Sequence, residues 1–385
     1  MKIGVVCNAP GELWGWARPV VHELSKRGHE VSLWLLYCPY ASGSERDVAL
    51  RLGCHVKGPF NPFTAFAKMS GEKVDCVIQL GGDIFWGKLL AKKSPLLCYT
   101  YGHKKGLKEC QAVFTAYEKL NDEIGNACVI GDLVKDALKL DSVQGTEQEE
   151  ISVWKNYNGN RVVFLPGSRE NIRLKGLYFI KEIVKILTDE WEDFKPVVLF
   201  PPFAGDSELE LWNENKLNPI RQGAGIVMPR ADYIITQPGT NTLEMMHCGA
   251  PGLVLAPLSF LKEMPVSGIG GLITKIPLIG LKLKEFVLRR KLSRMKGYVS
   301  WPNRLANMSV LDELVGDFSP SDAARATIKA LSDKERLISV KNKLLELSAQ
   351  SEGPDKPGGS RTPVEYGGSR APALLCDYVD SILAN

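Results

Sequence analysis

Short apolar runs alternate with helix-like segments along the first 130 residues of the chain. The runs that predict strands cover residues 3–7, 30–37, 74–80, 95–100, 112–115 and 127–130. The first run ends at the turn Asn8-Ala9-Pro10-Gly11, and a helix is predicted from there to about Arg27, ended by Gly28. Short apolar strands separated by helices are typical of a parallel sheet that is covered on both faces. The pattern therefore predicts an α/β fold.

The same alternation restarts after a polar stretch at about residues 140–160, which we interpret as a link between two domains. Strands are predicted at 161–165, 196–200, 231–236 and 252–256, with helices at about 172–188 and 242–248. We expect domains at residues 1–155 and 160–345. A Gly-, Pro- and Ser-rich stretch at 351–371 predicts a loop, and apolar periodicity over 372–385 predicts a terminal helix that packs on the first domain.

Composition agrees with a two-domain globular protein. The 385 residues are 44% hydrophobic and 24% charged, which excludes an intrinsically disordered chain. The nine cysteines form no C-x-x-C pair and several lie in apolar runs, as expected of reduced thiols in a cytoplasmic protein. The five histidines are scattered, so no zinc site is predicted. Neither a signal peptide nor a spanning helix is expected, because every uncharged stretch is too short.

Two glycine-bearing turns in the second domain are candidates for binding a ligand. In the first, Gly167 and Ser168 can offer backbone N–H groups to a phosphate and Arg169 can pair with its oxygens, although an ordinary turn with a capping serine is the alternative. The second turn follows the strand at 231–236 and opens a helix. Its candidate residues are Gln237, Gly239, Thr240, Asn241 and Glu244.

Glu244 lies one turn inside that helix, where its carboxylate can accept hydrogen bonds from two sugar hydroxyls. The alternative is a capping box with Asn241 as the N-cap and Glu244 at the third helical position. Because two such turns occur in one tandem α/β chain, we expect a nucleotide-diphosphate site in the second domain.

The first domain offers two acidic candidates after its strands. Glu12 stands at a helix start, where it can serve either as a catalytic group or as a carboxylate that matches the helix dipole. Asp83 follows Gly81-Gly82 at the end of another strand and can act as a general base, with a helix N-cap as the alternative. No G-x-G-x-x-G is present, which argues against a dinucleotide site.

Three motifs in order give the chain a resemblance to the lipid-A-disaccharide synthase family of GT-B glycosyltransferases. Residues 165–169 read L-P-G-S-R, residues 238–244 read P-G-T-N-T-L-E where the family has S-G-T-x-T-L-E, and residues 298–306 read Y-V-S-W-P-N-R-L-A where it has Y-V-S-L-P-N-x-L-A. The resemblance is strong over about 160–330 and looser over 1–140.

The resemblance implies two Rossmann-like domains that face each other across a cleft, and inverting transfer of an acylated amino sugar from a UDP-sugar to a glycolipid without a nucleotide-bound metal or other cofactor. It implies that Gly167, Ser168 and Arg169 meet the diphosphate or donor sugar. It further implies that Gly239, Thr240 and Asn241 cradle phosphate, Glu244 holds the ribose, Asn303 lines the donor site and Asp83 deprotonates the acceptor, with Glu12 as the other candidate base.

Departures from the family lie mainly in the first domain. Its G-E-A-S-G-D-x-H-G is replaced by C-N-A-P-G-E-L-W-G over residues 7–15, its S-P-S-x-W-A-W by Y-T-Y-G-H-K-K over 99–105, and its G-H-P by G-D-L over 131–133. The acceptor is therefore open. The alternatives are another GT-B glycolipid transferase, a UDP-N-acetylglucosamine 2-epimerase, which the lack of a dense cluster of His, Asp and Glu disfavours, and a nucleotide-sugar-binding protein without catalysis.

One segment carries most of the positive charge. The formal charge of the chain is +4, but the stretch from Leu281 to Lys296 holds seven basic residues and one acidic residue, a net +6 that leaves −2 for the rest. Its leucines recur at helical spacing, which predicts a basic amphipathic helix on the cytoplasmic membrane surface, with a core-packed helix as the alternative. We therefore expect a cytoplasmic protein, peripheral at the inner face of that membrane. No basic patch is interleaved with aromatic residues, so nucleic acid is not an expected partner.

Overall fold

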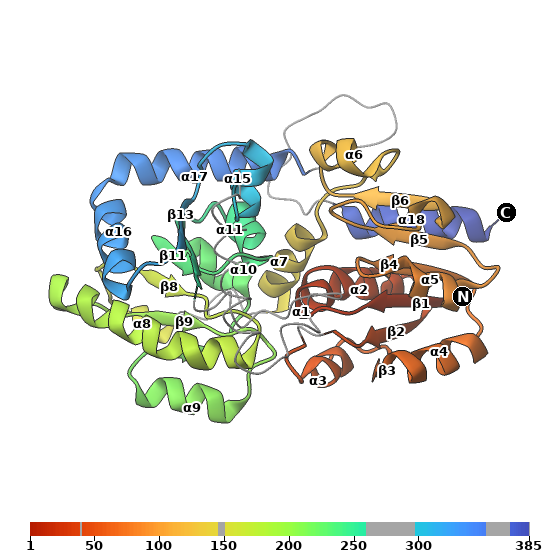
Figure 1. The fold of residues 1–385 in the computed structure, drawn as a ribbon, viewed down its shortest axis with the longest axis horizontal. Coiled ribbons are helices and arrows are strands. Elements are labelled where there is room, and N and C mark those ends of the chain that lie inside the picture. Colours follow the sequence, from red (N-terminus) through yellow and green to blue (C-terminus); the bar gives the residue numbers. More distant parts are fainter. Residues whose placement is uncertain (39–40, 145–150, 259–296, 352–369, 385) are drawn as a thin grey trace, which may run out of the picture. The chain divides into compact units, whose positions relative to one another are not determined.

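The computed structural model describes residues 1–38, 41–144, 151–258, 297–351 and 370–384. The chain divides into two compact units: unit 1 holds Met1–Gln144 and Ser348–Asn385, and unit 2 holds Gly145–Leu347. Each unit is built on one parallel sheet with helices beside it (Figure 1). The predicted basic segment at 281–296 and most of the predicted loop at 351–371 lie outside the described residues.

The sheet of unit 1 has seven strands in the order β3-β2-β1-β4-β5-β6-β7, all paired in parallel. The strands are β1 (Lys2–Cys7), β2 (Glu30–Leu36), β3 (His55–Phe60), β4 (Cys76–Leu80), β5 (Leu96–Tyr99), β6 (Ala112–Thr115) and β7 (Cys128–Val129). Every residue of β4 and β5 is buried, as expected of central strands that helices cover on both faces.

The helices of unit 1 follow the strands in alternation. They are α1 (Pro10–Glu12), α2 (Arg18–Lys26), α3 (Glu45–Leu50), α4 (Pro62–Gly71), α5 (Ile84–Ala91), α6 (Glu118–Ile124), α7 (Leu133–Gln144) and α18 (Ala371–Leu383), with a short 3₁₀ turn η2 at Leu107–Glu109. The helix predicted to run to Arg27 differs from an ideal one, because Leu13–Ala17 form a π-helical turn, η1, between α1 and α2. Such turns are rare and are frequent at functional sites.

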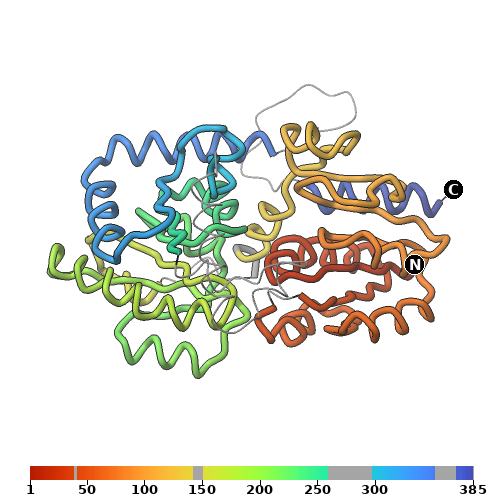
Figure 2. Tube along the Cα trace, in the orientation of Figure 1, coloured from red at the N-terminus to blue at the C-terminus, as the bar shows by residue number. Residues whose placement is uncertain are grey.

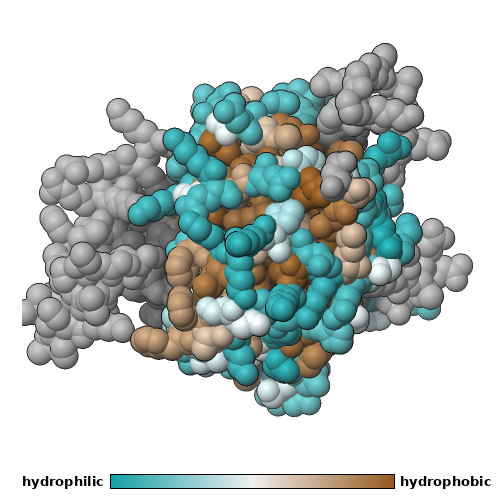
Figure 3. Space-filling model, turned by 90° about the vertical axis from the view of Figure 1, so that its right-hand side faces the viewer, coloured by the Kyte–Doolittle hydropathy of each residue, from teal (hydrophilic) through white to brown (hydrophobic). Residues whose placement is uncertain are grey.

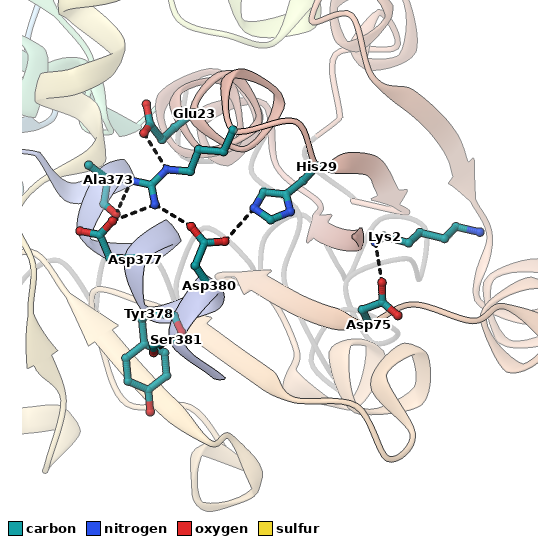
Figure 4. Close-up of polar contacts among 10 residues, drawn as sticks. Lys2, Glu23, His29, Asp75, Ala373, Asp377, Tyr378, Asp380 and Ser381 are labelled. Atoms are coloured by element: carbon teal, nitrogen blue, oxygen red, sulfur yellow. Dashed lines mark hydrogen bonds and ion pairs between the residues drawn. The ribbon is translucent and has the colours of Figure 1, made fainter. Parts of the chain in front are cut away.

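The terminal helix α18 belongs to unit 1. It packs against α2 and α7, and the blue C-terminal segment lies among the red to yellow elements of unit 1 (Figure 2). Arg27, which follows α2, donates to Asp377 and Asp380 at 2.8 and 2.9 Å, and His29 lies 2.9 Å from Asp380 (Figure 4). Buried Leu375 and the residues one turn on either side of it supply the apolar part of this contact.

The sheet of unit 2 has six parallel strands in the order β10-β9-β8-β11-β12-β13. The strands are β8 (Val162–Phe164), β9 (Val197–Leu199), β10 (Pro219–Ile220), β11 (Tyr233–Thr236), β12 (Gly252–Pro257) and β13 (Asp312–Gly316). The helices are α8 (Glu170–Glu190), α9 (Asp206–Glu214), α10 (Ala224–Val227), α11 (Asn241–Cys248), α15 (Trp301–Ala306), α16 (Pro320–Ser332) and α17 (Lys334–Ala349), with 3₁₀ turns η3 (Ser152–Trp154) and η4 (Met228–Arg230).

The hydrophobic core of unit 2 lies between the sheet and the helices that follow its strands. Phe200 and Trp212 meet edge to face, with ring centroids 5.2 Å apart, and α8 packs against α16.

All nine cysteines are free thiols, and burial raises the pKa of the Cys76 thiol to about 12. On the side of the molecule shown in Figure 3, hydrophobic residues lie between hydrophilic ones. Among the described residues, no helix is both long enough and apolar enough to cross a bilayer.

Candidate functional site

Both sheets reverse their strand order once, and the sequence-predicted residues other than Asn303 follow the strands at those two points. In unit 2 the chain runs from β8 outward to β10 and then returns to place β11 on the other side of β8. In unit 1 the same reversal puts β4 beside β1. Ligands of open parallel sheets bind outside the carboxyl ends of the strands at such reversals. The turns after β8 and β11, and those after β1 and β4, are therefore candidate ligand sites.

The structure brings the two predicted turns of unit 2 together. Gln237 donates from Nε2 to the carbonyl oxygen of Pro166 at 3.0 Å, which links the turn after β11 to the turn after β8. Gly167 has a φ of +94°, and a Cβ there would lie 3.3 Å from Oε1 of Gln237. Glycine is needed at this position because an L side chain is strained there and would also press on Gln237. The two turns thus form one surface at the strand ends.

An ion pair that the sequence analysis did not predict holds the first turn in place. Arg173 on α8 is buried and pairs with both carboxylate oxygens of Glu208 on α9, at 2.6 and 2.7 Å. Its third bond, from Nη1 to the carbonyl oxygen of Ser168, is 2.6 Å long. A planar guanidinium with three committed donors fixes its partners in place. Arg173 therefore positions the turn that carries the predicted Ser168 and Arg169.

The second turn differs from the capping box that the sequence suggested. The helix α11 begins at Asn241, so Thr240 and not Asn241 is the N-cap, and no side chain caps it. This places Glu244 one residue too far along to complete a capping box. Instead, Asn241 donates from Nδ2 to Oγ1 of Thr236 at 3.4 Å, and Thr242 donates to the carbonyl oxygen of Gly239 at 2.8 Å. Thr240, Asn241 and Glu244 are all partly exposed at this edge.

Asn303 is placed differently from the residues of the two turns. Its side chain is fully buried, its Oδ1 accepts from the backbone N–H groups of Val310 and Leu311 at 2.8 Å each, and its Nδ2 donates to Leu311 and to Glu313. Glu313 also accepts from Ser300. With its amide committed in this way, Asn303 ties α15 to residues 310–313, whereas the resemblance implied that its side chain lines the donor site.

Glu12 lies at the reversal point of the unit 1 sheet. Its Oε2 accepts from the N–H groups of Asn8 and Ala9 at 3.2 Å each, and a Cβ on Gly81 would come within 2.3 Å of its Oε1. Burial raises the pKa of this carboxyl above the ordinary 4.5, although the backbone hydrogen bonds and Lys104 act in the opposite direction. A carboxyl with a raised pKa at a strand end is a candidate acid or base.

Asp83 adopts the alternative that the sequence left open. It is exposed, and its Oδ1 accepts from the N–H of Phe85 at 3.0 Å as the N-cap of α5. It follows β4 and so lies at the same sheet edge as Glu12. Both carboxylates thus have a structural task, since Glu12 in turn accepts from the N–H of Ala9, the N-cap of α1.

The buried carboxylate of Asp132 joins two sequence segments that depart from the family pattern. Asp132 accepts from the hydroxyls of Tyr101 and Tyr117, the second at 2.5 Å, and from the N–H of Val134 at 2.9 Å. The ring of Tyr101 meets that of Trp16 with centroids 4.7 Å apart. The sequence analysis named the segments of Tyr101 and Asp132 as departures but had no signal that the two residues touch, because they are 31 positions apart.

Comparison with solved structures identifies the fold. The UDP-GlcNAc 2-epimerase from Neisseria meningitidis bound to UDP-GlcNAc has a TM-score of 0.58 at 15% identity, with 100% of each chain covered. The spinosyn rhamnosyltransferase SpnG complexed with spinosyn aglycone gives 0.55 at 12%, covering 99% of this chain and 100% of that one. MurG from Acinetobacter baumannii gives 0.51 at 13%, with 99% and 100% covered.

These likenesses confirm the predicted fold class: the chain has the GT-B fold, with two Rossmann-like parallel-sheet domains. No protein-family model and no curated protein matches the chain. Among the described residues, no group of three or more His, Cys, Asp or Glu side chains is arranged to hold a metal ion.

Proposed function

We propose that this chain transfers a sugar from a UDP-sugar to a hydroxyl group of an acceptor, with inversion at the anomeric carbon. The observation that carries the proposal is the joining of two glycine-bearing turns at the reversal point of the unit 2 sheet, through Gln237 and Pro166. Backbone N–H groups at strand ends and helix starts are suited to a diphosphate. The acceptor is assigned to unit 1, where Glu12 provides a carboxyl.

The roles in unit 2 follow from position. Gly167, Ser168 and Arg169 would meet the diphosphate or the donor sugar, with the turn held by Arg173. Gly239, Thr240 and Asn241 would cradle phosphate at the start of α11, and Glu244, one turn further along, would accept from the ribose hydroxyls. Asn303 would act on the donor site only through the placing of α15, whose first residue, Trp301, donates from its N–H to Oγ1 of Thr242 at 3.1 Å.

The chemistry requires a base and a stabilised leaving group. The Glu12 carboxylate takes the proton of the acceptor hydroxyl, whose oxygen attacks C1 of the donor sugar while the bond from C1 to the diphosphate oxygen breaks. UDP leaves with the electron pair, and the developing charge is met by turn N–H groups and Arg169. Glu12 is chosen as the base because burial raises its pKa; both it and Asp83 accept backbone N–H bonds at the start of a helix.

The more specific proposal is transfer of an acylated amino sugar to a glycolipid acceptor, as in lipid A disaccharide synthesis, at the inner face of the cytoplasmic membrane. It is supported by the L-P-G-S-R and P-G-T-N-T-L-E sequences of the two joined turns. The replaced motifs of unit 1, two of which meet at Asp132, favour an acceptor that differs from that of the family. Another glycolipid transfer reaction, or nucleotide-sugar binding without catalysis, are the other outcomes.

Incubation with UDP-sugars and a membrane lipid extract, followed by mass analysis, tests the proposal. We expect UDP to be released only when the extract is present, together with a lipid whose mass has increased by one sugar residue. Conversion of UDP-N-acetylglucosamine to its C2 epimer without any extract would instead assign an epimerase, the activity named for the Neisseria meningitidis neighbour. If the chain binds the UDP-sugar but forms neither the glycosylated lipid nor the C2 epimer, it is a nucleotide-sugar-binding protein without catalysis.

Replacing Gly167 with alanine is expected to weaken UDP binding by about tenfold and to lower the free energy of unfolding by about 1–2 kcal/mol, because the left-handed backbone strains an L residue. Titration calorimetry with UDP and urea unfolding measure the two effects. Gly176→Ala on α8 is the matched control, since a Cβ there meets no atom within 4 Å. Equal UDP affinity in both variants would place the nucleotide away from this turn.

A further inference from the structure

A glutamine stands in an otherwise apolar strand at the centre of unit 1. The strand β4 reads C-V-I-Q-L, and all five of its residues are buried. Gln79 has no exposed surface, and it pairs in register with Val6 of β1 and Cys98 of β5. A buried amide costs free energy unless its polar atoms are paired, so its position in the middle of the sheet needs a physical reason.

The packing of the side chain does not supply that reason. Oε1 of Gln79 is buried and accepts no hydrogen bond from the residues that the structure describes. It faces Gly87 of α5, where a Cβ would lie 2.7 Å from this oxygen and 2.9 Å from Cδ1 of Leu96. Methionine has the same length and no carbonyl to leave unpaired, so an apolar side chain would fill the space at a lower cost in free energy.

The other polar atom of the amide holds the turn that follows β4. Nε2 of Gln79 donates to the carbonyl oxygen of Gly81 at 2.7 Å, and the N–H of Gly81 donates to the carbonyl oxygen of Tyr99 at 2.9 Å. Gly81 and Gly82 both have a φ of +64°, in the left-handed region. Two successive residues in this region keep their conformation only where neighbouring groups hold them. Gln79 is one of those groups.

This turn contacts Glu12. A Cβ on Gly81 would come within 2.3 Å of Oε1 of Glu12, and the N–H of Gly82 is hydrogen-bonded to the same carboxyl. A Cβ on Gly82 would lie 3.1 Å from Oδ1 of Asn8, whose own N–H also donates to Glu12. The turns after β1 and β4 therefore meet at this carboxyl, and the place of one of its donors depends on how the carbonyl of Gly81 is held.

We infer that Gln79 is a positioning residue for Glu12, and that it acts through the carbonyl of Gly81 and the N–H of Gly82. The bond from Gln79 fixes the turn, and the turn fixes a donor to the carboxyl. The effect of Gln79 on sugar transfer rests on the proposed function, in which Glu12 is the base, whereas the placing of the carboxyl does not.

The titration of Glu12 reports on this arrangement. Burial raises the pKa of its carboxyl, and backbone N–H bonds, that of the turn among them, lower it. The other groups that act on it are Lys104, whose ammonium lowers the pKa of Glu12, and two thiols. Burial keeps Cys7 neutral, and contact with Cys110 together with burial keeps Cys98 neutral. Loss of the N–H bond from the turn therefore moves the pKa of Glu12 further upward.

Gln79→Met tests the inference, because it keeps the length of the side chain and removes both polar atoms. The carboxyl NMR signal of Glu12, assigned by its absence in Glu12→Gln, is followed against pH in the full chain. We expect its midpoint to rise by about 0.5 pH unit or more. The urea midpoint of unfolding is expected to be no lower than that of the parent chain, because the unpaired carbonyl is gone. The kcat of transfer is expected to fall by about tenfold, with the KM for lipid extract and the affinity for UDP unchanged.

Two further variants complete the test. Thr115→Val is the matched control, because Oγ1 of Thr115 is also buried without a hydrogen-bond partner in the described part of the chain, but on β6, two strands from β4. It is expected to change neither the titration of Glu12 nor the transfer. Gly87→Ala presses on Oε1 of Gln79 from α5 and is expected to raise the midpoint of Glu12, so it decides the question if Gln79→Met does not fold.

An unchanged midpoint of Glu12 in Gln79→Met, or in Gly87→Ala if the first variant does not fold, would overturn the inference, and a loss of stability beside it would assign Gln79 to the packing of β4. A shift of the same size in Thr115→Val would overturn it as well, because the effect would not come from the turn. A raised midpoint with unchanged transfer would support the positioning and remove Glu12 as the base of the proposed function. Absence of transfer by the parent chain bears on the proposed function alone, since the titration needs no substrate.

Discussion

Replacing Glu12 with glutamine is expected to lower the rate of sugar transfer by about 10²–10⁴-fold while leaving the affinity for UDP unchanged. Glutamine keeps the length of the side chain and an oxygen that accepts from Asn8 and Ala9, but it cannot take a proton. The nucleotide site is assigned to the other unit, so binding serves as an internal check on folding. Transfer is measured by UDP release with lipid extract, and affinity by calorimetry.

Asp83→Asn is the matched control for the base. Asparagine is as good an N-cap as aspartate, so this variant preserves the bond to Phe85 and the start of α5. We expect it to retain transfer within about tenfold, whereas loss of a true base would cost 10²-fold or more. A reversal of the two results, with Asp83→Asn inactive and Glu12→Gln active, would move the base to Asp83.

The raised pKa of Glu12 gives this assignment a signature in pH. Because the base must be ionised, transfer by the parent chain is expected to rise with pH through a midpoint above 4.5, the ordinary value for glutamate. The stability effect has the opposite sign: a raised folded-state pKa favours the folded state below 4.5, and that contribution is lost as pH rises through the folded pKa. Glu12→Gln is expected to remove this contribution to the pH dependence of stability, which urea unfolding curves recorded across this pH range measure.

Replacing Glu208 with alanine is expected to lower the free energy of unfolding by about 3–5 kcal/mol, because it leaves the guanidinium of Arg173 buried without its counter-charge. The side chains are 1% and 9% exposed, so water can replace the lost carboxylate only in part. Since Arg173 also holds Ser168, UDP affinity is expected to fall as well. Urea unfolding and calorimetry measure the two effects.

Asp206→Ala provides the control on the same helix. Asp206 pairs with Arg221 at 2.6 Å, but its side chain is 88% exposed, and such surface pairs contribute about 1 kcal/mol or less. The comparison separates burial of the pair from the removal of a negative charge on α9. Similar losses of stability in both variants would show that the ion pair of Arg173 is not what fixes this part of unit 2.

The central strands of both sheets could be predicted from the sequence, and the strands that were missed lie at sheet edges. β3, β10 and β13 each have a neighbour on one side only, and all but one of their residues are partly or fully exposed. β13 reads D-E-L-V-G, in which the acidic residues bind Ser300 and Arg336 instead of packing. A search for apolar runs finds strands that are buried on both faces and passes over such edges.

In the candidate site, contacts that follow from the order of strands could be predicted from the sequence, and contacts between distant side chains could not. The two turns of unit 2 could be expected to meet, because both follow parallel strands and ligand sites form at the carboxyl ends. The contributions of Arg173 and Asp132 could not, because Glu208 is 35 positions from Arg173, Tyr101 is 31 from Asp132, and nothing in the local pattern marks either pair. Asn303 shows the reverse case: its motif was recognised, but its role depends on Val310 and Leu311, which only the fold places around it.

The return of α18 to unit 1 has a consequence for the order in which the chain can fold during synthesis. Unit 2 is one continuous stretch and can complete its sheet as soon as β13 and α16 have left the ribosome. Unit 1 must wait, because α2 and α7 keep an uncovered apolar surface until residues 371–383 arrive. Unit 1 is thus translated first but completed last. Until α18 is made, the apolar surface of α2 and α7 is exposed and could be bound by a chaperone.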